Sequence, residues 1–243
     1  LHRYMPNAGF PDTRKSIANN INSETNLNFT EEEIIMTCGA AGAINVFLKS
    51  ILDQDDEVII ISPYFAEYLF YIKNHNGIPV ISRSNKDFLP NLEDLSKKIN
   101  NKTKAILINS PNNPSGVIYH DEIIKQLGLL LEKFEKKYEK SIYLVSDEPY
   151  RKVVYEKKCP YIFNFYKNSV VVTSFSKDLG LAGERIGYIA FNPKISNKSD
   201  LIDAAIFSNR TLGFVNAPAI SQRIVKELQD SVIDITFYKS KRD

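Results

Sequence analysis

A lysine stands among hydroxyl residues directly after a strongly apolar stretch. Ser174-Phe-Ser-Lys177 follows the run Val170–Val172, and Arg185 comes eight positions after the lysine. A lysine that performs covalent carbonyl chemistry needs an amine that is partly desolvated or close to another cation. Arg185 can supply that charge and bind a phosphate, and Ser174 and Ser176 can donate to the same phosphate. Taken alone, the motif has an alternative interpretation, which is a solvated lysine in a glycine-rich loop without a chemical role.

A carboxylate and a tyrosine follow another apolar run, in Val145-Ser-Asp147-Glu-Pro-Tyr150. A carboxylate such as Asp147 can pair with a protonated ring nitrogen, which keeps a pyridine cofactor cationic and able to accept electrons. Tyr150 can hydrogen-bond a phenolate oxygen on the same ring. The alternative is an acidic strand end that caps a helix.

The segment Ile108-Asn-Ser-Pro-Asn-Asn-Pro-Ser-Gly116 is a dense turn signal. Its prolines restrict the backbone, so that Asn113 can be presented rigidly and its amide can donate to the phenolate oxygen. A plain surface turn is the alternative.

Small residues link a strand to an apolar helix in Cys38-Gly-Ala-Ala-Gly-Ala43. The free amides at the start of a helix, with the helix dipole, favour a phosphate there. This turn has neither the Rossmann spacing nor the lysine of a P-loop, so by itself it is weak evidence.

Strand and helix patterns alternate along the chain. The expected strands are 34–37, 57–61, 79–83, 104–109, 141–146, 169–174 and 186–191, and the expected helices are 40–52, 66–74, 92–99, 121–138, 199–211 and 217–232, with a further helix opening at Arg14. This alternation predicts a three-layer α/β/α fold with a mostly parallel central sheet. Ligands of such sheets collect at the carboxyl ends of the strands, where the polar residues above lie.

Composition narrows the class of protein. The chain has 243 residues, 43% of them hydrophobic, and 31 basic against 29 acidic residues, a net charge of +2. This balance gives no electrostatic case for a nucleic-acid partner. No apolar run is long enough to cross a membrane. The two isolated cysteines fit a reducing, cytoplasmic compartment. We expect one domain over residues 1–243 that is truncated at both ends.

The four motifs together resemble the large domain of fold-type-I pyridoxal-phosphate enzymes, close to the class I/II (aspartate) aminotransferase family. The resemblance covers nearly the whole sequence. It implies pyridoxal 5′-phosphate held as a Schiff base on Lys177, with Asp147 on the ring nitrogen. The other implied cofactor-binding residues are Asn113 and Tyr150 on the phenolate oxygen, Phe65 stacked on the ring, and Ser174, Ser176, Arg185 and the backbone amides of Ala40 and Ala41 on the phosphate.

The first residues also match the family. Tyr4, in Tyr4-Met-Pro-Asn-Ala-Gly9, matches a tyrosine that contacts the phosphate of the neighbouring subunit. The resemblance therefore implies a homodimer, with residues 1–30 as an interface segment. A loose N-terminal aromatic is the alternative. Two departures stand out: many relatives have a hydroxyl residue where this chain has Ala41, and no position here matches the arginine that binds the substrate α-carboxylate.

The implied reaction is transfer of an amino group between an α-amino acid and a 2-oxo acid, with Lys177, Asp147 and Tyr150 as catalytic residues. A β- or γ-lyase or a decarboxylase on the same scaffold remains open, because these enzymes share the cofactor motifs. So does a regulatory module that binds the cofactor without turnover. No metal site is expected.

Overall fold

The central feature of the fold is one twisted sheet. The structure, a computed structural model, describes residues 4–155, 158–229, 231 and 233–242. In this part of the chain a 7-stranded sheet has the order β1-β7-β6-β5-β4-β2-β3. The strands are β1 (Ile34–Thr37), β2 (Glu57–Ser62), β3 (Ile78–Arg83), β4 (Thr103–Asn109), β5 (Tyr143–Asp147), β6 (Ser169–Ser174) and β7 (Gly187–Phe191).

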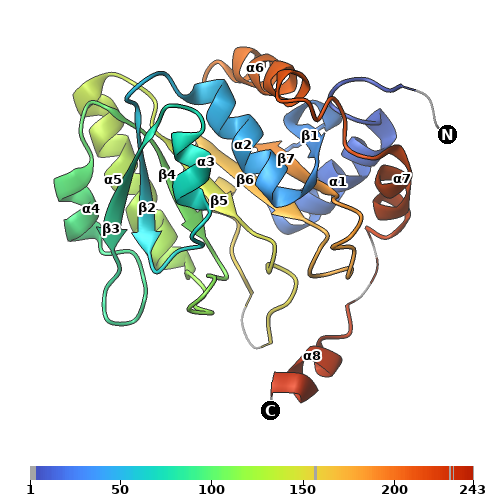
Figure 1. Cartoon of the computed structure of the whole chain (residues 1–243). Helices are drawn as coiled ribbons and strands as arrows, with labels where there is room; N and C mark the ends of the chain where they lie inside the picture. The colour runs from blue at the N-terminus through green and yellow to red at the C-terminus, as the bar shows by residue number, and fades with distance from the viewer. Residues whose placement is uncertain (1–3, 156–157, 230, 232, 243) are drawn as a thin grey trace.

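Strand direction brings the polar strand ends together. Strands β3, β2, β4, β5 and β6 pair in parallel, whereas β7 is antiparallel to both β6 and β1. The carboxyl ends of all strands except β7 therefore meet at one edge of the sheet, the lower edge in Figure 1. The mostly parallel sheet predicted from the alternating pattern is confirmed.

Helices cover both faces of the sheet, which makes the three layers (Figure 1). One face carries α1 (Pro11–Glu24), α4 (Leu92–Lys98), α5 (Asp121–Tyr138) and α7 (Ala219–Glu227), and the other carries α2 (Gly39–Ile51), α3 (Tyr68–Lys73) and α6 (Lys198–Thr211). Short 3-10 helices span Glu31–Glu33 and Ile162–Asn164. Helix α8 (Ile235–Arg242) stands beyond the carboxyl edge.

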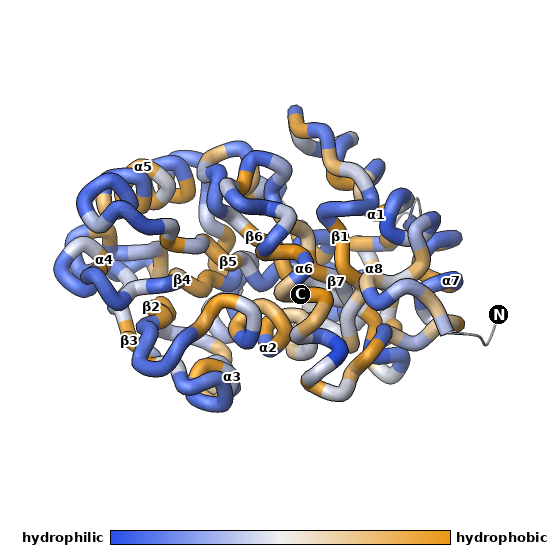
Figure 2. The backbone as a smooth tube through the Cα atoms, turned by 90° about the horizontal axis from the view of Figure 1, so that it is seen from above, coloured by the Kyte–Doolittle hydropathy of each residue, from blue (hydrophilic) through white to orange (hydrophobic). Residues whose placement is uncertain are grey.

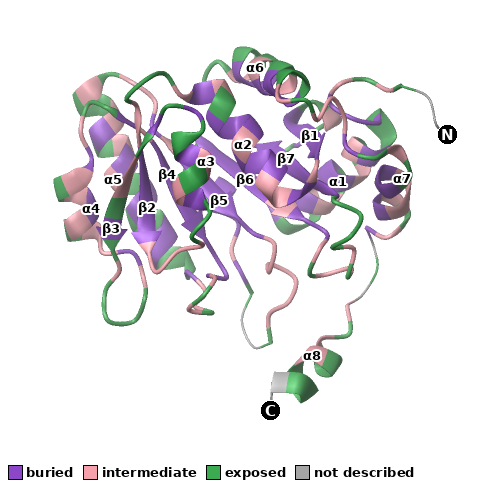
Figure 3. Cartoon of the chain, viewed as in Figure 1, coloured by how far each residue is buried: buried purple, intermediate pink, exposed green. Residues whose placement is uncertain are grey.

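The core lies on both sides of the sheet because its central strands are apolar on both faces. In β6, Val171 packs into the cluster under α5, and Val170 and Val172 pack into the cluster under α2. Burying an aliphatic side chain of this size contributes roughly 1.5–3 kcal/mol. Figure 2 shows the hydrophobic strands in the middle of the molecule, and Figure 3 shows that the same strands are buried while α8 is largely exposed.

Most element boundaries follow the sequence pattern, and the differences have local causes. The predicted bounds of β1, β6 and α5 are confirmed. The first helix starts at Pro11, not at Arg14, because a proline suits the first helical position. Helix α7 is shorter than the predicted 217–232: Pro218 precedes its first residue and it ends at Glu227, while positions 230 and 232 lie outside the described residues.

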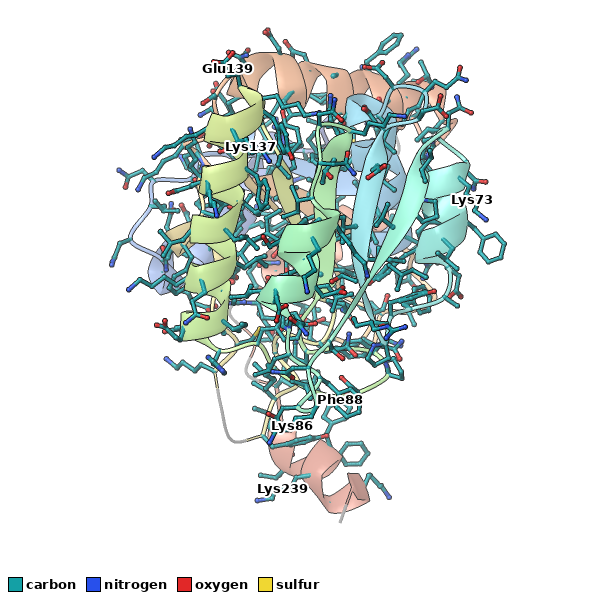
Figure 4. The ribbon with its side chains drawn as sticks, turned by 90° about the vertical axis from the view of Figure 1, so that its left-hand side faces the viewer. Lys73, Lys86, Phe88, Lys137, Glu139 and Lys239 are labelled. Carbon is teal, nitrogen blue, oxygen red and sulfur yellow. The ribbon has the colours of Figure 1, made fainter. Side chains whose placement is uncertain are left out.

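The described helices include none with the length and apolar character needed to cross a membrane. Figure 4 shows which residues lie at the two ends of the molecule. Lys86 and Phe88, in the loop after β3, lie at the same end as Lys239 of α8, whereas Lys137 and Glu139 lie at the opposite end.

The free edge of β3 is held by two side chains of α4. Lys98 Nζ donates to the carbonyl of Ile81 at 2.5 Å, and Asp94 Oδ2 accepts from the amide of Arg83 at 2.9 Å. Alternate residues of a strand point their backbone groups to the same side, so Pro79 faces this edge too and offers no N–H there. These contacts occupy backbone groups that another strand would need.

We expect Asp94→Asn to lower the free energy of unfolding by about 1 kcal/mol at neutral pH, because a charged hydrogen-bond acceptor is lost. The Lys98 ammonium group lowers the pKa of Asp94 to about 2, and the Ser82 hydroxyl and Arg83 amide act in the same direction. A folded-state pKa below the ordinary value stabilises the protein above about pH 4, and this contribution is lost as the pH falls toward 2. Urea unfolding across that range measures the effect.

Glu93→Gln is the matched control. Glu93 pairs with Lys97 on the same helix, but both side chains are more than two-thirds exposed, at 79% and 71%. Such a pair contributes little, so this variant should unfold like the wild type. Equal effects of the two substitutions would contradict a special role for the Asp94–Lys98 pair.

Candidate active site

A cavity of about 400 Å³ opens at the carboxyl edge of the sheet. Every predicted site residue except Tyr4 lines it: Ala40, Ala41, Phe65, Asn113, Asp147, Tyr150, Ser174, Ser176, Lys177 and Arg185. These residues come from the ends of β4, β5 and β6, the start of α2, and the segments that precede α3 and β7. The parallel sheet thus gathers segments that are far apart in the sequence.

Asp147 is a buried carboxylate at the end of β5, with only 6% of its surface exposed. Tyr68 Oη donates to its Oδ2 at 2.5 Å. The other oxygen, Oδ1, is also buried and has no hydrogen-bond partner among the described residues. A buried carboxylate oxygen without a partner is costly, so this atom is suited to a donor supplied by a ligand.

The charge state of Asp147 depends on what occupies the cavity. Burial raises its pKa to about 7, the charge of Glu148 acts in the same direction, and the Tyr68 hydrogen bond opposes them. A cation placed at Oδ1 would favour the carboxylate form and lower this pKa. Glu148, in contrast, already has a cationic partner within the chain, because its Oε2 accepts from Arg151 Nη1 at 3.0 Å.

The turn after β4 is ordered by its asparagines. Asn109 donates from Nδ2 to the Asp147 carbonyl at 2.7 Å and accepts from the Asn113 amide at 2.6 Å. It therefore ties the ends of β4 and β5 to each other and directs Asn113 toward the cavity. Burial and the charge of Asp147 raise the pKa of Tyr150, and a hydrogen bond with Asn113 opposes them. This predicted pair thus lies together.

Helix α2 begins at the cavity with its first amides available. Its N-cap residue, Cys38, makes no side-chain cap, so the side chain of this residue does not compete for these amides. Arg185 lies against this turn: its Nη2 would be 3.1 Å from a Cβ placed on Gly39. Gly39 also has a φ of +70°, which favours glycine. The helix start and the guanidinium together form an anion-binding corner.

Gly187 joins the two halves of this corner. It pairs with Thr37 at the end of β1 and with Ser174 at the end of β6. A Cβ on Gly187 would lie 2.3 Å from the Thr173 carbonyl oxygen and 2.8 Å from the Gly39 carbonyl carbon. Only glycine allows this approach, which sets the α2 turn beside the loop that carries Lys177.

Lys177 lies in the loop after β6 and is exposed in this structure. Its Nζ is 5.8 Å from the centre of the Tyr150 ring. Its backbone carbonyl accepts from Tyr238 Oη of α8 at 3.2 Å. The Lys177 amine thus reaches the cavity from the solvent side. It lies beside Tyr150, which is also predicted to be a catalytic residue.

Two tyrosines that line the cavity were missed by the sequence reasoning, and one predicted residue lies elsewhere. Tyr68 and Tyr71 both line the cavity. Their signal was the spacing of three between them and from Phe65, which puts residues on one helix face. Tyr4 does not line the cavity and is 92% exposed. Its predicted role needs a second copy of the chain, so it stays a prediction.

A larger hollow, of about 510 Å³, is lined by charged residues at the end of α5 and before β6. It contains none of the predicted site residues. Lysines and glutamates alternate around it, so its charges largely cancel, and it offers no comparable set of groups for chemistry.

We expect Asp147→Asn to change how the stability of the cofactor-free protein depends on pH. A carboxylate whose folded-state pKa is raised from 3.8 to about 7 stabilises the fold fully at low pH, and this stability is lost as the pH rises through 7. The neutral amide has no such loss. The free energy of unfolding of the variant, compared with that of the wild type, should therefore rise by on the order of 3 kcal/mol from pH 4 to pH 8. Urea unfolding at the two pH values measures this difference.

Asp203→Asn, on the exposed side of α6, is the control and should follow the wild-type curve. Parallel curves for wild type and Asp147→Asn would mean that the buried carboxylate does not carry this pH dependence.

Comparisons with known proteins agree with this geometry. The model of the family "Aminotransferase class I and II" matches residues 1–241. A probable aspartate aminotransferase of Methanocaldococcus jannaschii is 34% identical over 203 residues, which are 84% of this chain and 52% of the relative. The aspartate aminotransferase of Bacillus subtilis is 35% identical over 195 residues, covering 77% of this chain and 48% of the relative.

Solved structures give the same picture. An amino transferase from Eubacterium rectale superposes with a TM-score of 0.97 at 36% identity, covering 100% of this chain and 62% of that chain. The aspartate aminotransferase of Thermus thermophilus with maleate has a TM-score of 0.83 at 30% identity, covering 94% and 57%.

The chain spans about half the length of the curated relatives it matches. Pyridoxal 5′-phosphate is the cofactor of the aspartate aminotransferases. The match extends over nearly all of the chain, so the family predicted from the motifs is confirmed: this chain belongs to the class I and II aminotransferases.

Proposed function

We propose that this chain is the cofactor-binding large domain, over residues 1–243, of a pyridoxal-phosphate-dependent aminotransferase. The complete protein would move an amino group between an α-amino acid and a 2-oxo acid. One observation carries the proposal: a lysine, a buried carboxylate with an unpartnered oxygen, and an anion-binding corner line the same cavity.

The residues present fit the cofactor. The cavity volume of about 400 Å³ is in the usual range for small-molecule sites. Asp147 Oδ1 has no donor among the described residues, and a protonated pyridine nitrogen is a donor with the right charge. The corner formed by Gly39, Arg185 and the start of α2 suits a dianionic phosphate. The ring and the phosphate thus each find a matching group.

When bound, the cofactor supplies an electron sink next to the substrate α-carbon. Asp147 would keep a proton on the ring nitrogen. Lys177 Nζ would hold the cofactor covalently as a Schiff base and, when released, would accept the α-proton as general base. Tyr150 and Asn113 would donate to the phenolate oxygen. Phe65 would stack on the ring, and the amides of Ala40 and Ala41 with Ser174, Ser176 and Arg185 would bind the phosphate.

The proposal extends to the oligomeric state, the partners and the cellular compartment of the protein. A homodimer is proposed, with residues 1–30 at the interface and Tyr4 reaching the partner's phosphate; residues 1–3 lie outside the described part of the chain. The near-neutral charge argues against a nucleic-acid partner, and we propose no membrane association. Two free cysteines, Cys38 and Cys159, are consistent with the cytoplasm.

We expect pyridoxal 5′-phosphate to give a visible absorbance band with this protein, and borohydride to fix the cofactor on Lys177. A Schiff base absorbs in the visible range and its reduced form is stable to digestion, so peptide mapping identifies the labelled lysine. Lys177→Ala should lose the label. It should also lose formation of a 2-oxo acid and an aminated acceptor, assayed in the complete protein.

Lys152→Ala is the matched control because Lys152 lies near the Lys177 loop but does not line the cavity. It should label like the wild type. A label on another lysine would refute the assignment, and release of ammonia or carbon dioxide in place of an aminated product would refute the reaction class.

We expect the complete protein to be a dimer, with Tyr4→Phe weakening cofactor binding in that dimer. The Tyr4 side chain is 92% exposed and makes no hydrogen bond with another described residue, so it is accessible to a second copy of the chain. Sedimentation velocity measures the assembly, and a fully active monomer would contradict the proposed contact between subunits.

A further inference from the structure

Tyr71 presents a second tyrosine side chain to the cavity beside Tyr68. The two are three residues apart in α3, so they share one face of the helix. Both line the cavity. Tyr71 is partly buried and packs against the hydrophobic cluster that includes Ile44, one turn into α2. Ile44 lines the cavity as well, so Tyr71 and the first turns of α2 border the same space.

The hydroxyl of Tyr71 has no hydrogen-bond partner among the described residues, in contrast to that of Tyr68, which donates to Asp147. A tyrosine hydroxyl can donate one hydrogen bond and also accept. Because this hydroxyl belongs to a residue of the cavity wall, it is available to a ligand.

The burial and surroundings of Tyr71 favour the protonated hydroxyl. Burial raises the pKa of Tyr71, the charges of Glu67 and Asp147 act in the same direction, and the charge of Arg185 lowers it. The hydroxyl thus lies within electrostatic reach of both ends of the site, the carboxylate and the guanidinium. At neutral pH it is a donor, which is what a phosphate oxygen needs.

The start of α2 leaves room for such a donor. Gly39, Ala40 and Ala41 have no polar side-chain atoms, and Cys38 makes no cap, so this turn offers a phosphate only backbone amides. Of the predicted phosphate-binding side chains, Ser174 and Ser176 come from the end of β6 and the loop after it, and Arg185 comes from the segment before β7. The described residues of the α2 turn itself therefore supply no side-chain donor.

We propose that Tyr71 donates a hydrogen bond to the phosphate of the bound cofactor, in the place that a hydroxyl side chain at position 41 would fill. This inference rests on the proposed function, because it presupposes that pyridoxal 5′-phosphate occupies the cavity. It adds a cofactor-binding residue that the sequence motifs did not indicate.

Equilibrium titration of the cofactor-free protein tests the inference with two ligands, pyridoxal 5′-phosphate and pyridoxal, which lacks the phosphate. For Tyr71→Phe we expect affinity for pyridoxal 5′-phosphate to fall by about tenfold to a hundredfold, the loss of one hydrogen bond to a charged group. Affinity for pyridoxal should stay within about twofold of wild type. Tyr64→Phe is the control, because Tyr64 packs against the same cluster without lining the cavity.

A second variant checks the position of the missing donor. Ala41→Ser in the Tyr71→Phe background should recover most of the lost affinity for pyridoxal 5′-phosphate and leave pyridoxal unaffected. Equal weakening of both ligands would overturn the inference, since Tyr71 would then act on the ring or on packing. Unchanged affinity for both would overturn it as well. If the wild type itself binds no pyridoxal 5′-phosphate, the proposed function fails instead.

Discussion

The buried carboxylate of Asp147 is the constraint on which the site depends. A carboxylate at 6% exposure needs partners, and the protein supplies one firm donor, Tyr68, and leaves Oδ1 open to the cavity. The fold therefore tolerates a local instability that a cationic ligand would relieve. Placing the residue at the end of a central strand makes this possible, because β5 is fixed on both sides by β4 and β6.

The other groups depend on how closely the backbone segments approach one another. Gly187 lets β7 lie against both β6 and the turn that opens α2, so Arg185 and the helix start face the same space. Asn109 joins the ends of β4 and β5 through hydrogen bonds with the Asp147 carbonyl and the Asn113 amide. The site is thus built from backbone contacts at strand ends, and its side chains project from positions that the sheet already determines.

Local pattern predicted much of this arrangement. Lys177, Asp147 and Asn113 each follow an apolar run, and a parallel sheet brings such positions to one edge. The pairing of Tyr68 with Asp147 escaped prediction because the two residues lie 79 positions apart, and no local signal pairs a tyrosine with a distant carboxylate. The early end of α7 at Glu227 was equally hidden, since the apolar pattern continues past it. For Tyr4 the relevant neighbour would belong to another chain.

Both borders of the sheet are occupied. At one, α4 holds Ile81 and Arg83 of β3; at the other, the Met36 amide of β1 donates to the Ala8 carbonyl of the N-terminal segment at 2.9 Å. A sheet with such borders is a poor template for the growth of intermolecular β-structure. Molecules at the high concentrations of a crowded cell should then meet through their helices and loops, and misassembly would first require α4 or the segment around Ala8 to detach.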